Sequence, residues 1–366
     1  MQYYTHKSIY GVLGKAGATK LCELLGMAFN QPIQPNFSFR GFVHRGAYNP
    51  HGWGIAYYPD CELAAQVIKE PLQSTNSTFA AFLKDNKGIR SKIFISHVRY
   101  ATFSPCFANT HPFSRVLGDR EYVFAHNGHL SGNYRDLLSA GRWTSMGTTD
   151  SEYAFCHLMH IIENRVPAWN EESFSRLENS MREINQFGNF NCLLSDGERL
   201  FCYRDINGYK GLHYTKRKAP FSSVKLVDED YEINLTEEKA PSQKGFIIAT
   251  RPLTDEQWKE LEPGRLAVID KGTLVFPQNE SRLHEQLFHV LRFIRTAPHR
   301  VTIQEISSKM ELALDEVRLL IQQLLDKGLI RQDRRDTVEP YSATATYYTV
   351  PRRRLEIDAL IKVLFD

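Results

Sequence analysis

The sequence predicts an α+β protein: a strand-rich domain with a few helices, followed by a smaller helical unit. Short runs rich in β-branched and aromatic residues recur between residues 53 and 272, bounded by Gly, Pro, Asp or Asn. Helical segments fall among these runs without regular alternation, which argues against a parallel βαβ sheet. Beyond residue 278 the apolar residues follow helical spacing instead. We therefore expect one domain over 22–278 and a second over 279–366.

The first domain is expected to contain at least seven strands and three helices. Helices are expected at 76–87, 150–163 and 171–186. The strands are expected at 53–58, 92–98, 122–127, 189–196, 199–204, 244–250 and 265–272.

The second domain has the pattern of a winged helix-turn-helix. Three helical runs, "LHEQLFHVLRFIRTA", "TIQEISSKM" and "LDEVRLLIQQLLDKGLI", precede the strand-like "ATATYYTV" and a final short helix. Residues 279–366 carry 14 Lys/Arg and 13 Asp/Glu, a net charge of +1, and the third run opens with Asp315 and Glu316. Acidic residues there are unfavourable beside phosphates. This favours packing or oligomerisation over DNA binding, although Arg331, Arg334, Arg335 and the three arginines at 352–354 could form a basic wing or strip.

Composition indicates a globular protein without a polyanionic partner. Hydrophobic residues make up 42% of the 366 residues, and the net charge is only +3. No apolar run is long enough to span a bilayer, and the N-terminus lacks a secretory apolar core, so a cytoplasmic location is expected. The six cysteines are scattered without a CxxC pair, which predicts free packing thiols and neither a metal site nor a cofactor.

"SHVRYAT" places an arginine at the end of a strand. Ile95, His97 and Arg99 share one face of that strand. A guanidinium there requires an anion, because it cannot lose its charge. An internal salt bridge is the more common explanation, and a clamp for a substrate carboxylate is the alternative.

Two further stretches each allow a structural and a functional interpretation. In "AHNGHL", Asn127 and Gly128 are typical of a turn, but the same dipeptide can also stabilise an oxyanion. In "GTTDSE", Thr149 and Glu152 predict a capping box. Asp150 then lies in the first helical turn, where the helix dipole favours a carboxylate and where a substrate ammonium could also bind.

Taken in order, these stretches resemble the class II glutamine amidotransferases. The resemblance rests on Cys22 at the head of a strand, then "HRG", "GWGIAYY", "SHVRYAT", "HPF", "AHNG" and "TTDSE". It is closest to the small stand-alone members and implies an N-terminal-nucleophile hydrolase with a four-layer αββα sandwich. Two positions depart from the family: His51 stands where Asp is expected, and Tyr100 where larger relatives often carry Trp. Because of these two departures, the resemblance does not determine the acceptor side of the pocket.

The resemblance implies a role for each site residue. Cys22 would attack a γ-carbonyl and form a thioester, with its own α-amino group as the base. Asn127 and Gly128 would hold the oxyanion. The substrate head group would be bound by Arg99 at the α-carboxylate and by Asp150 at the α-ammonium, with Thr102 near the carboxylate.

Three functions remain open from the sequence. The first is hydrolysis of the γ-amide of glutamine or of a γ-glutamyl compound, which needs no partner and is favoured. The second is a glutaminase subunit that passes ammonia to a separate synthase. The third is a ligand-sensing DNA-binding regulator. A homo-oligomer is compatible with each of them.

Residues 1–21 show no convincing periodicity, yet the implied mechanism requires a free amine on Cys22. They are expected to be a propeptide or translated sequence upstream of the true start. In the second case Leu21 would be the initiator, read from a leucine codon such as TTG, which is the favoured alternative.

Overall fold

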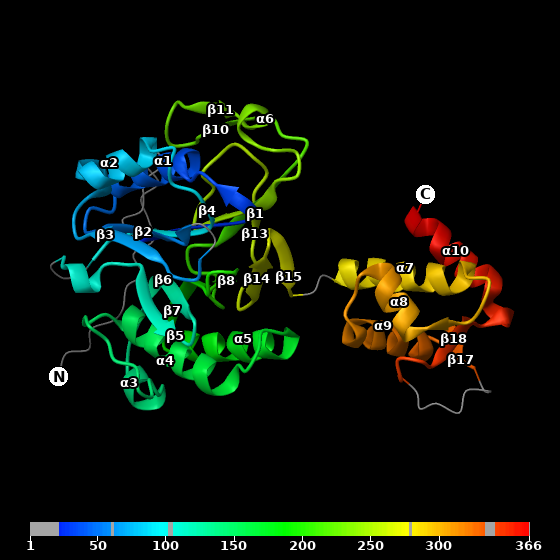
Figure 1. The fold of residues 1–366 in the computed structure, drawn as a ribbon. Coiled ribbons are helices and arrows are strands. Elements are labelled where there is room, and N and C mark those ends of the chain that lie inside the picture. Colours follow the sequence, from blue (N-terminus) through cyan, green and yellow to red (C-terminus); the bar gives the residue numbers. More distant parts are fainter. Residues whose placement is uncertain (1–21, 60–61, 102–104, 278–279, 334–340, 366) are drawn as a thin grey trace, which may run out of the picture. The chain divides into compact units, whose positions relative to one another are not determined.

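The computed structural model describes residues 22–59, 62–101, 105–277, 280–333 and 341–365. The chain divides into two compact units, one ending at Pro277 and the other following it. Each unit is described by itself (Figure 1).

The first sheet has seven antiparallel strands in the order β13-β9-β12-β1-β4-β2-β3. Its central strand is β1, which pairs with β12 on one side and β4 on the other. The strands are β1 (Glu23–Ile33), β2 (Trp53–Tyr57), β3 (Gln66–Glu70), β4 (Ser91–Val98), β9 (His213–Lys218), β12 (Lys244–Ala249) and β13 (Lys259–Glu260).

The second sheet has six antiparallel strands in the order β15-β14-β8-β7-β6-β5. Its strands are β5 (Phe113–Leu117), β6 (Arg120–Leu130), β7 (Gly188–Ser195), β8 (Arg199–Tyr203), β14 (Leu266–Asp270) and β15 (Thr273–Phe276). A separate two-stranded ribbon, β10 (Ser223–Lys225) with β11 (Glu232–Asn234), precedes the short helix α6 (Leu235–Glu238).

Helices cover the outer faces of the two sheets. Helices α1 (Asn36–His44) and α2 (Thr78–Asp85) pack on the seven-stranded sheet. Helices α4 (Asp150–Arg165) and α5 (Glu171–Asn185) pack on the six-stranded sheet, near the short α3 (Tyr134–Leu137). A further apolar core lies between the sheets. Figure 1 shows the resulting order of layers, helix, sheet, sheet and helix. This is the mixed α/β architecture that the sequence predicted.

Strand β1 is buried on both faces. Leu24 and Ala28 belong to the core between the sheets, whereas Leu25, Met27 and Phe29 pack under the helices. Because both faces are buried, the strand reads as a continuous apolar run. A Cβ at Gly26 would lie 3.0 Å from Leu200 Cδ2 and 3.1 Å from Leu193 Cδ1. Side chains of the second sheet therefore approach β1 closely where it has no side chain.

The predicted helices of this unit are confirmed at Thr78–Asp85, Asp150–Arg165 and Glu171–Asn185. The five described thiols form no disulfide, as expected. Cys156, Cys192 and Cys202 are buried packing residues, but Cys106 is exposed, so the expectation that every non-catalytic thiol is a packing thiol was wrong for it. Cys61 lies outside the described residues.

In the residues that the structure describes, the second unit contains four α-helices and a small antiparallel sheet in the order β16-β18-β17. One apolar core, which includes Leu291, Ile306, Leu320 and Tyr347, joins helices and sheet. The helices are α7 (Glu280–Thr296), α8 (Ile303–Met310), α9 (Leu314–Asp326) and α10 (Arg354–Phe365); the strands are β16 (Val301–Thr302), β17 (Ile330–Gln332) and β18 (Thr346–Thr349).

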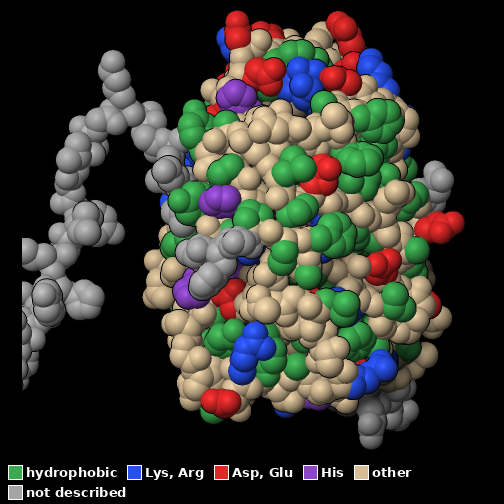
Figure 2. Space-filling model, turned by 90° about the vertical axis from the view of Figure 1, so that its left-hand side faces the viewer, with side chains coloured by type: hydrophobic (Ala, Val, Ile, Leu, Met, Phe, Trp, Pro, Cys, Tyr) green, Lys and Arg blue, Asp and Glu red, His purple; other side chains and the backbone are tan. Residues whose placement is uncertain are grey.

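The visible surface is mixed in charge. Figure 2 shows acidic and basic side chains interspersed with hydrophobic ones over the face that it presents. In the part of the chain that the structure covers, no helix is both long enough and apolar enough to cross a membrane.

Candidate active site

Three residues of the predicted site, one just before β1, one just after β4 and one inside β6, face the same inter-sheet space. Val123 and Ala125 of β6 face the core between the sheets, as do Ile93 and Ile95 of β4. Side chains alternate along a strand, so Asn127 and Arg99 continue these two faces, and Cys22 continues the face of Leu24 in β1. Glu23 pairs with Val98, which puts Cys22 opposite Arg99. The cysteine, the arginine and the asparagine therefore face the edge of the same inter-sheet space.

The thiol of Cys22 is partly exposed and is held by the main chain of Tyr100. Tyr100 N–H donates to Sγ at 3.3 Å, and Sγ lies 3.4 Å from the Tyr100 carbonyl oxygen. Burial raises the pKa of this thiol, and the Tyr100 main chain and the Arg99 charge oppose that shift only in part. The resting sulfur is therefore a neutral thiol, and a base is needed to make the nucleophilic thiolate.

Arg99 is positioned by its main chain, while part of its side chain has no partner. Its N–H donates to the Gly52 carbonyl at 2.8 Å, and its own carbonyl accepts from His51 N–H at 3.0 Å. The side-chain Nη1 is buried and makes no hydrogen bond within the described chain. Burial lowers the pKa of Arg99, whereas Cys22, Cys106 and Asp150 act in the other direction. The internal salt bridge that the sequence favoured does not form among the described residues.

Asn127 and Gly128 lie inside β6, so the turn predicted from their sequence was wrong. Asn127 pairs with Asn191 and Gly128 with Phe190, and the strand continues to Leu130 because β7 pairs with it throughout. The Asn127 Nδ2 group is buried and has no hydrogen-bond acceptor among the described residues. An unpaired donor of this kind normally carries a free-energy cost of about 1–3 kcal/mol.

The main-chain N–H of Gly128 points away from β7. Phe190 N–H is donated to Asp205 Oδ2 at 2.8 Å and not across to Gly128, so the two residues form a non-hydrogen-bonded pair. Leu130, two residues on, has the same orientation and donates its N–H to Asp150 Oδ2 at 2.5 Å. Strand β5 ends its pairing at Phe124, which leaves this edge of β6 open at Gly128.

A side chain at position 128 would collide with β7. A Cβ there would overlap the main-chain oxygen of Asn189 and crowd His126 Nε2. We expect Gly128→Ala to lower the free energy of unfolding by roughly 2–4 kcal/mol, because strand β7 must move. Urea unfolding measures this, with the exposed Gly88→Ala, where a Cβ meets only Asn86 Oδ1 at 3.1 Å, as the control. Equal stability of both variants would contradict the expectation.

Asp150 begins α4 and is attached to the end of β6. Besides the bond from Leu130, its Oδ1 accepts from Ser151 N–H at 2.9 Å, and His129 Nδ1 lies 3.4 Å from Oδ2. Its side chain is 18% exposed, so one side of the carboxylate remains open to a ligand. Its charge raises the pKa of both Cys22 and Arg99, so the carboxylate lies within electrostatic reach of these two groups.

The predicted capping box at the start of α4 is only half formed. Thr149 accepts from Glu152 N–H at 3.2 Å, as expected. The Glu152 carboxylate instead accepts from Met146 and Gly147 N–H and pairs with Arg115 at 2.7 Å. The Glu152 carboxylate therefore holds the loop before the helix in place. The Asp150 carboxylate takes no part in these contacts.

His51, a departure from the family pattern, orders the chain after Arg99. Its Nδ1 accepts from Ala101 N–H at 2.9 Å, and its ring lies 5.0 Å from the Tyr100 ring. Thr102, the remaining predicted site residue, lies outside the described residues.

No local sequence pattern predicted the residues that hold the start of β1 next to Cys22. Glu23 is buried and accepts from Arg45 Nη1 at 2.8 Å and from Arg251 Nε at 3.0 Å. Arg45 comes from the "HRG" stretch, so that motif fixes the first residue of β1. Burial raises the pKa of Tyr209 to about 12.

Comparisons with known proteins bear on the family of this chain. A family model described as glutamine amidotransferases class-II matches residues 21–290. An uncharacterized protein of Methanocaldococcus jannaschii is 44% identical over 350 residues, 93% of this chain and 97% of that protein. The Escherichia coli protein named "Putative glutamine amidotransferase YafJ" is 39% identical over 263 residues, 70% of this chain and all of that protein.

One solved structure has a similar fold. The crystal structure of a predicted glutamine amidotransferase from Pseudomonas aeruginosa superposes with a TM-score of 0.52 at 29% identity, covering 69% of this chain and 99% of that one. The extent of the family match and the identity to two relatives over nearly their whole length lead to one conclusion: this chain belongs to the class II glutamine amidotransferases.

Proposed function

We propose that the first unit hydrolyses the γ-amide of glutamine, or of a γ-glutamyl compound, through a thioester on Cys22. The observation that carries this proposal is a pair of buried donors, Arg99 Nη1 and Asn127 Nδ2, that have no partner among the described residues and lie on the same face as the partly exposed Cys22. Such donors cost free energy in the empty protein, and a bound carboxylate and a carbonyl oxygen would satisfy them.

Opposite charges would select the amino-acid head group. Arg99 would bind the α-carboxylate through two hydrogen bonds, and Asp150 the α-ammonium. Fixing both groups of the head would set the position of the γ-carbonyl carbon relative to the Cys22 sulfur. An amide that lacks the α-carboxylate and the α-amine should therefore be a poor substrate.

The reaction would proceed in two halves. The Cys22 sulfur attacks the γ-carbonyl carbon while its proton passes to the α-amino group of the same residue, in a chain that begins there. The Asn127 amide and the Gly128 N–H hold the resulting oxyanion. The proton is then delivered to the leaving nitrogen, the C–N bond breaks, and water hydrolyses the thioester to glutamate.

The second unit is proposed to be a winged helix. Support comes from the element order α7, β16, α8, α9, β17, β18 and from the antiparallel sheet of three short strands. The Escherichia coli relative is matched over its whole length by 70% of this chain. The second unit is therefore best treated as an addition to the hydrolase, used for packing or oligomerisation.

The test compares three amides in a chain that begins at Cys22. Ammonia release from glutamine, cleavage of a γ-glutamyl dipeptide and ammonia release from butyramide are measured side by side. We expect activity on at least one of the first two, little on butyramide, and complete loss of activity in Cys22→Ala. Cys106→Ala, which removes the exposed thiol that also acts on Arg99, should retain activity. Activity that survives Cys22→Ala would refute the thioester.

The same assay separates the two enzyme alternatives. Faster turnover of the γ-glutamyl dipeptide supports a stand-alone hydrolase. Faster release of ammonia from glutamine, with little cleavage of the dipeptide, supports a glutaminase that serves a separate synthase.

A further inference from the structure

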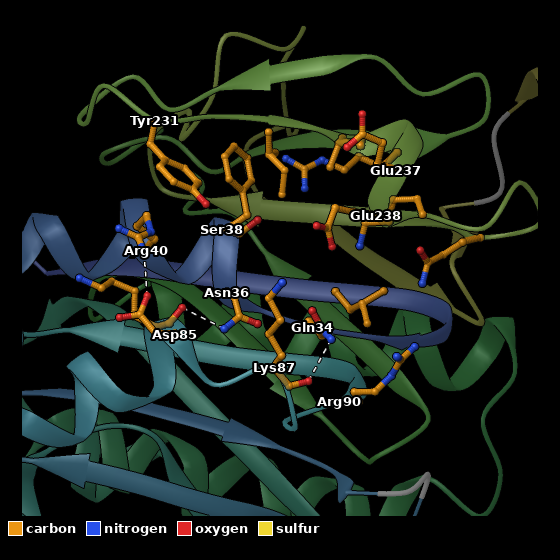
Figure 3. A pocket seen from close by; sticks show the side chains of 18 residues that line it. Gln34, Asn36, Ser38, Arg40, Asp85, Lys87, Arg90, Tyr231, Glu237 and Glu238 are labelled. Atoms are coloured by element: carbon orange, nitrogen blue, oxygen red, sulfur yellow. Dashed lines mark hydrogen bonds and ion pairs between the residues drawn. The ribbon is translucent and has the colours of Figure 1, made fainter.

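A second pocket lies at the end of β1 that is remote from Cys22. Ile33 and Gln34 form part of its wall, so the length of β1 separates it from the thiol by roughly 30 Å. Its volume is about 390 Å³. Figure 3 shows it between α1 and the α2–β4 loop on one side and the segment containing β11 and α6 on the other.

Positive side chains outnumber negative ones in this pocket. Three acidic residues, Asp85, Glu237 and Glu238, line it, against six basic ones: Arg40, Lys84, Lys87, Arg90, Arg217 and Lys239. Two of the basic residues have carboxylate partners. Arg40 pairs with Asp85 at 2.7 Å, and Arg217 pairs with Glu256 at 2.6 Å. For the other four the described chain shows no ion pair, so cationic groups remain in excess.

Lys239 is the most exceptional of the unpaired cations. Burial lowers its pKa to about 8; Arg217 and Arg90 act in the same direction, and only Glu238 opposes them. Its Nζ lies 5.3 Å from the ring centroid of Phe29 in β1, so the ammonium group packs against the seven-stranded sheet. An ammonium removed from water without an anionic partner is unfavourable. A bound anion would relieve that cost and restore the usual pKa.

A polar acceptor completes the pocket. Asn36 Nδ2 donates to the main-chain oxygens of Lys84 at 2.9 Å and Asn86 at 3.0 Å, which fixes the orientation of the amide. Its Oδ1 is buried and has no donor within the described chain. Figure 3 shows Asn36 beside Lys87 within the pocket. A ligand that satisfies Oδ1 must carry an O–H or N–H group.

We propose that this pocket binds the phosphate group of a small phosphorylated molecule that also carries a hydroxyl or amine donor. Lys239, Arg90 and Lys87 would contact the phosphate, and Asn36 Oδ1 would accept from the donor. The volume suits a molecule of this class. Glu237 and Glu238 limit the positive charge of the pocket, which favours a single phosphate over a polyphosphate. This assignment is independent of the proposed hydrolase function.

Calorimetric titration of the full chain tests the proposal. The probes are adenosine monophosphate and glucose 6-phosphate, with adenosine, glucose and inorganic phosphate as comparisons. We expect saturable binding of at least one ester, and binding about 10-fold or more weaker for its unphosphorylated counterpart and for inorganic phosphate. Failure of both esters to bind, or equally tight binding of inorganic phosphate, would overturn the assignment.

Two lysine variants locate the binding. Lys239→Met should weaken binding of the ester about 10-fold or more, because a charged hydrogen bond is lost. Its melting temperature should be unchanged or higher, since it removes a partly buried cation that has no ion pair among the described residues. Lys225→Met, on β10 outside the pocket and paired with Asp230 at 2.8 Å, is the control and should bind normally. Binding that survives Lys239→Met, or that falls equally in both variants, would place the ligand elsewhere.

Discussion

A chain that begins at Cys22 is expected to release ammonia from glutamine about 10²–10⁴ times faster than the 366-residue chain. The reason is the state of the thiol. Burial raises the pKa of Cys22, so a base must take its proton. In a chain that begins there, the α-amino group has a pKa of about 8 and can act as that base. When Leu21 precedes it, the same nitrogen belongs to an amide and cannot accept a proton.

The comparison needs the free cysteine made cleanly, for instance by protease removal of a fusion that leaves Cys22 first. The rate of the shortened form should fall as pH drops through the amine pKa, because only the neutral amine is a base. Cys22→Ala in the same shortened form sets the background. Equal rates for the long and short chains would show that the base lies elsewhere.

Asn127→Leu is expected to lower kcat about 10²–10³-fold without loss of stability. Its Nδ2 has no partner among the described residues, so the substitution breaks no hydrogen bond made by that group and buries an apolar group of similar size. The oxyanion, however, would lose its side-chain donor. Steady-state kinetics and thermal unfolding of the same preparation measure the two effects.

The facing residue provides a matched control for this prediction. Asn191 of β7 lies directly opposite Asn127, but its side chain has partners. Its Nδ2 donates to the main-chain oxygen of Tyr209 at 2.6 Å, and its Oδ1 accepts from Asp205 N–H at 2.9 Å. Asn191→Leu should therefore destabilise the protein, while Asn127→Leu should not. A large fall in melting temperature for Asn127→Leu, or an unchanged kcat, would argue against an oxyanion role.

The sequence predicted the local structure of the site better than its long-range contacts. The start of α4 at Asp150 was predictable because a cap and the apolar residues that follow it lie within a few positions. The prediction of a turn at Asn127–Gly128 was wrong. The dipeptide favours a turn locally, but pairing with β7, some sixty residues later in the chain, extends the strand through it.

Arg99 illustrates a second limit of sequence reasoning. Its place on the strand face follows from alternation, but whether its guanidinium meets a carboxylate depends on residues from other strands. The pairing of Glu23 with Arg45 and Arg251 was likewise invisible, since these residues are far apart in the chain and nothing local marks them as partners. Strand faces are encoded locally, whereas partners across the fold are not.

The close approach of the sheets at Gly26 has a consequence for how activity would be lost. Cys22 and Arg99 belong to one sheet, and Asn127 to the other, so their relative positions depend on how the sheets pack. A small slip between the layers would separate nucleophile from oxyanion donor while both sheets kept their own hydrogen bonds. If the proposed site is correct, we therefore expect activity to be lost on heating before either sheet unfolds.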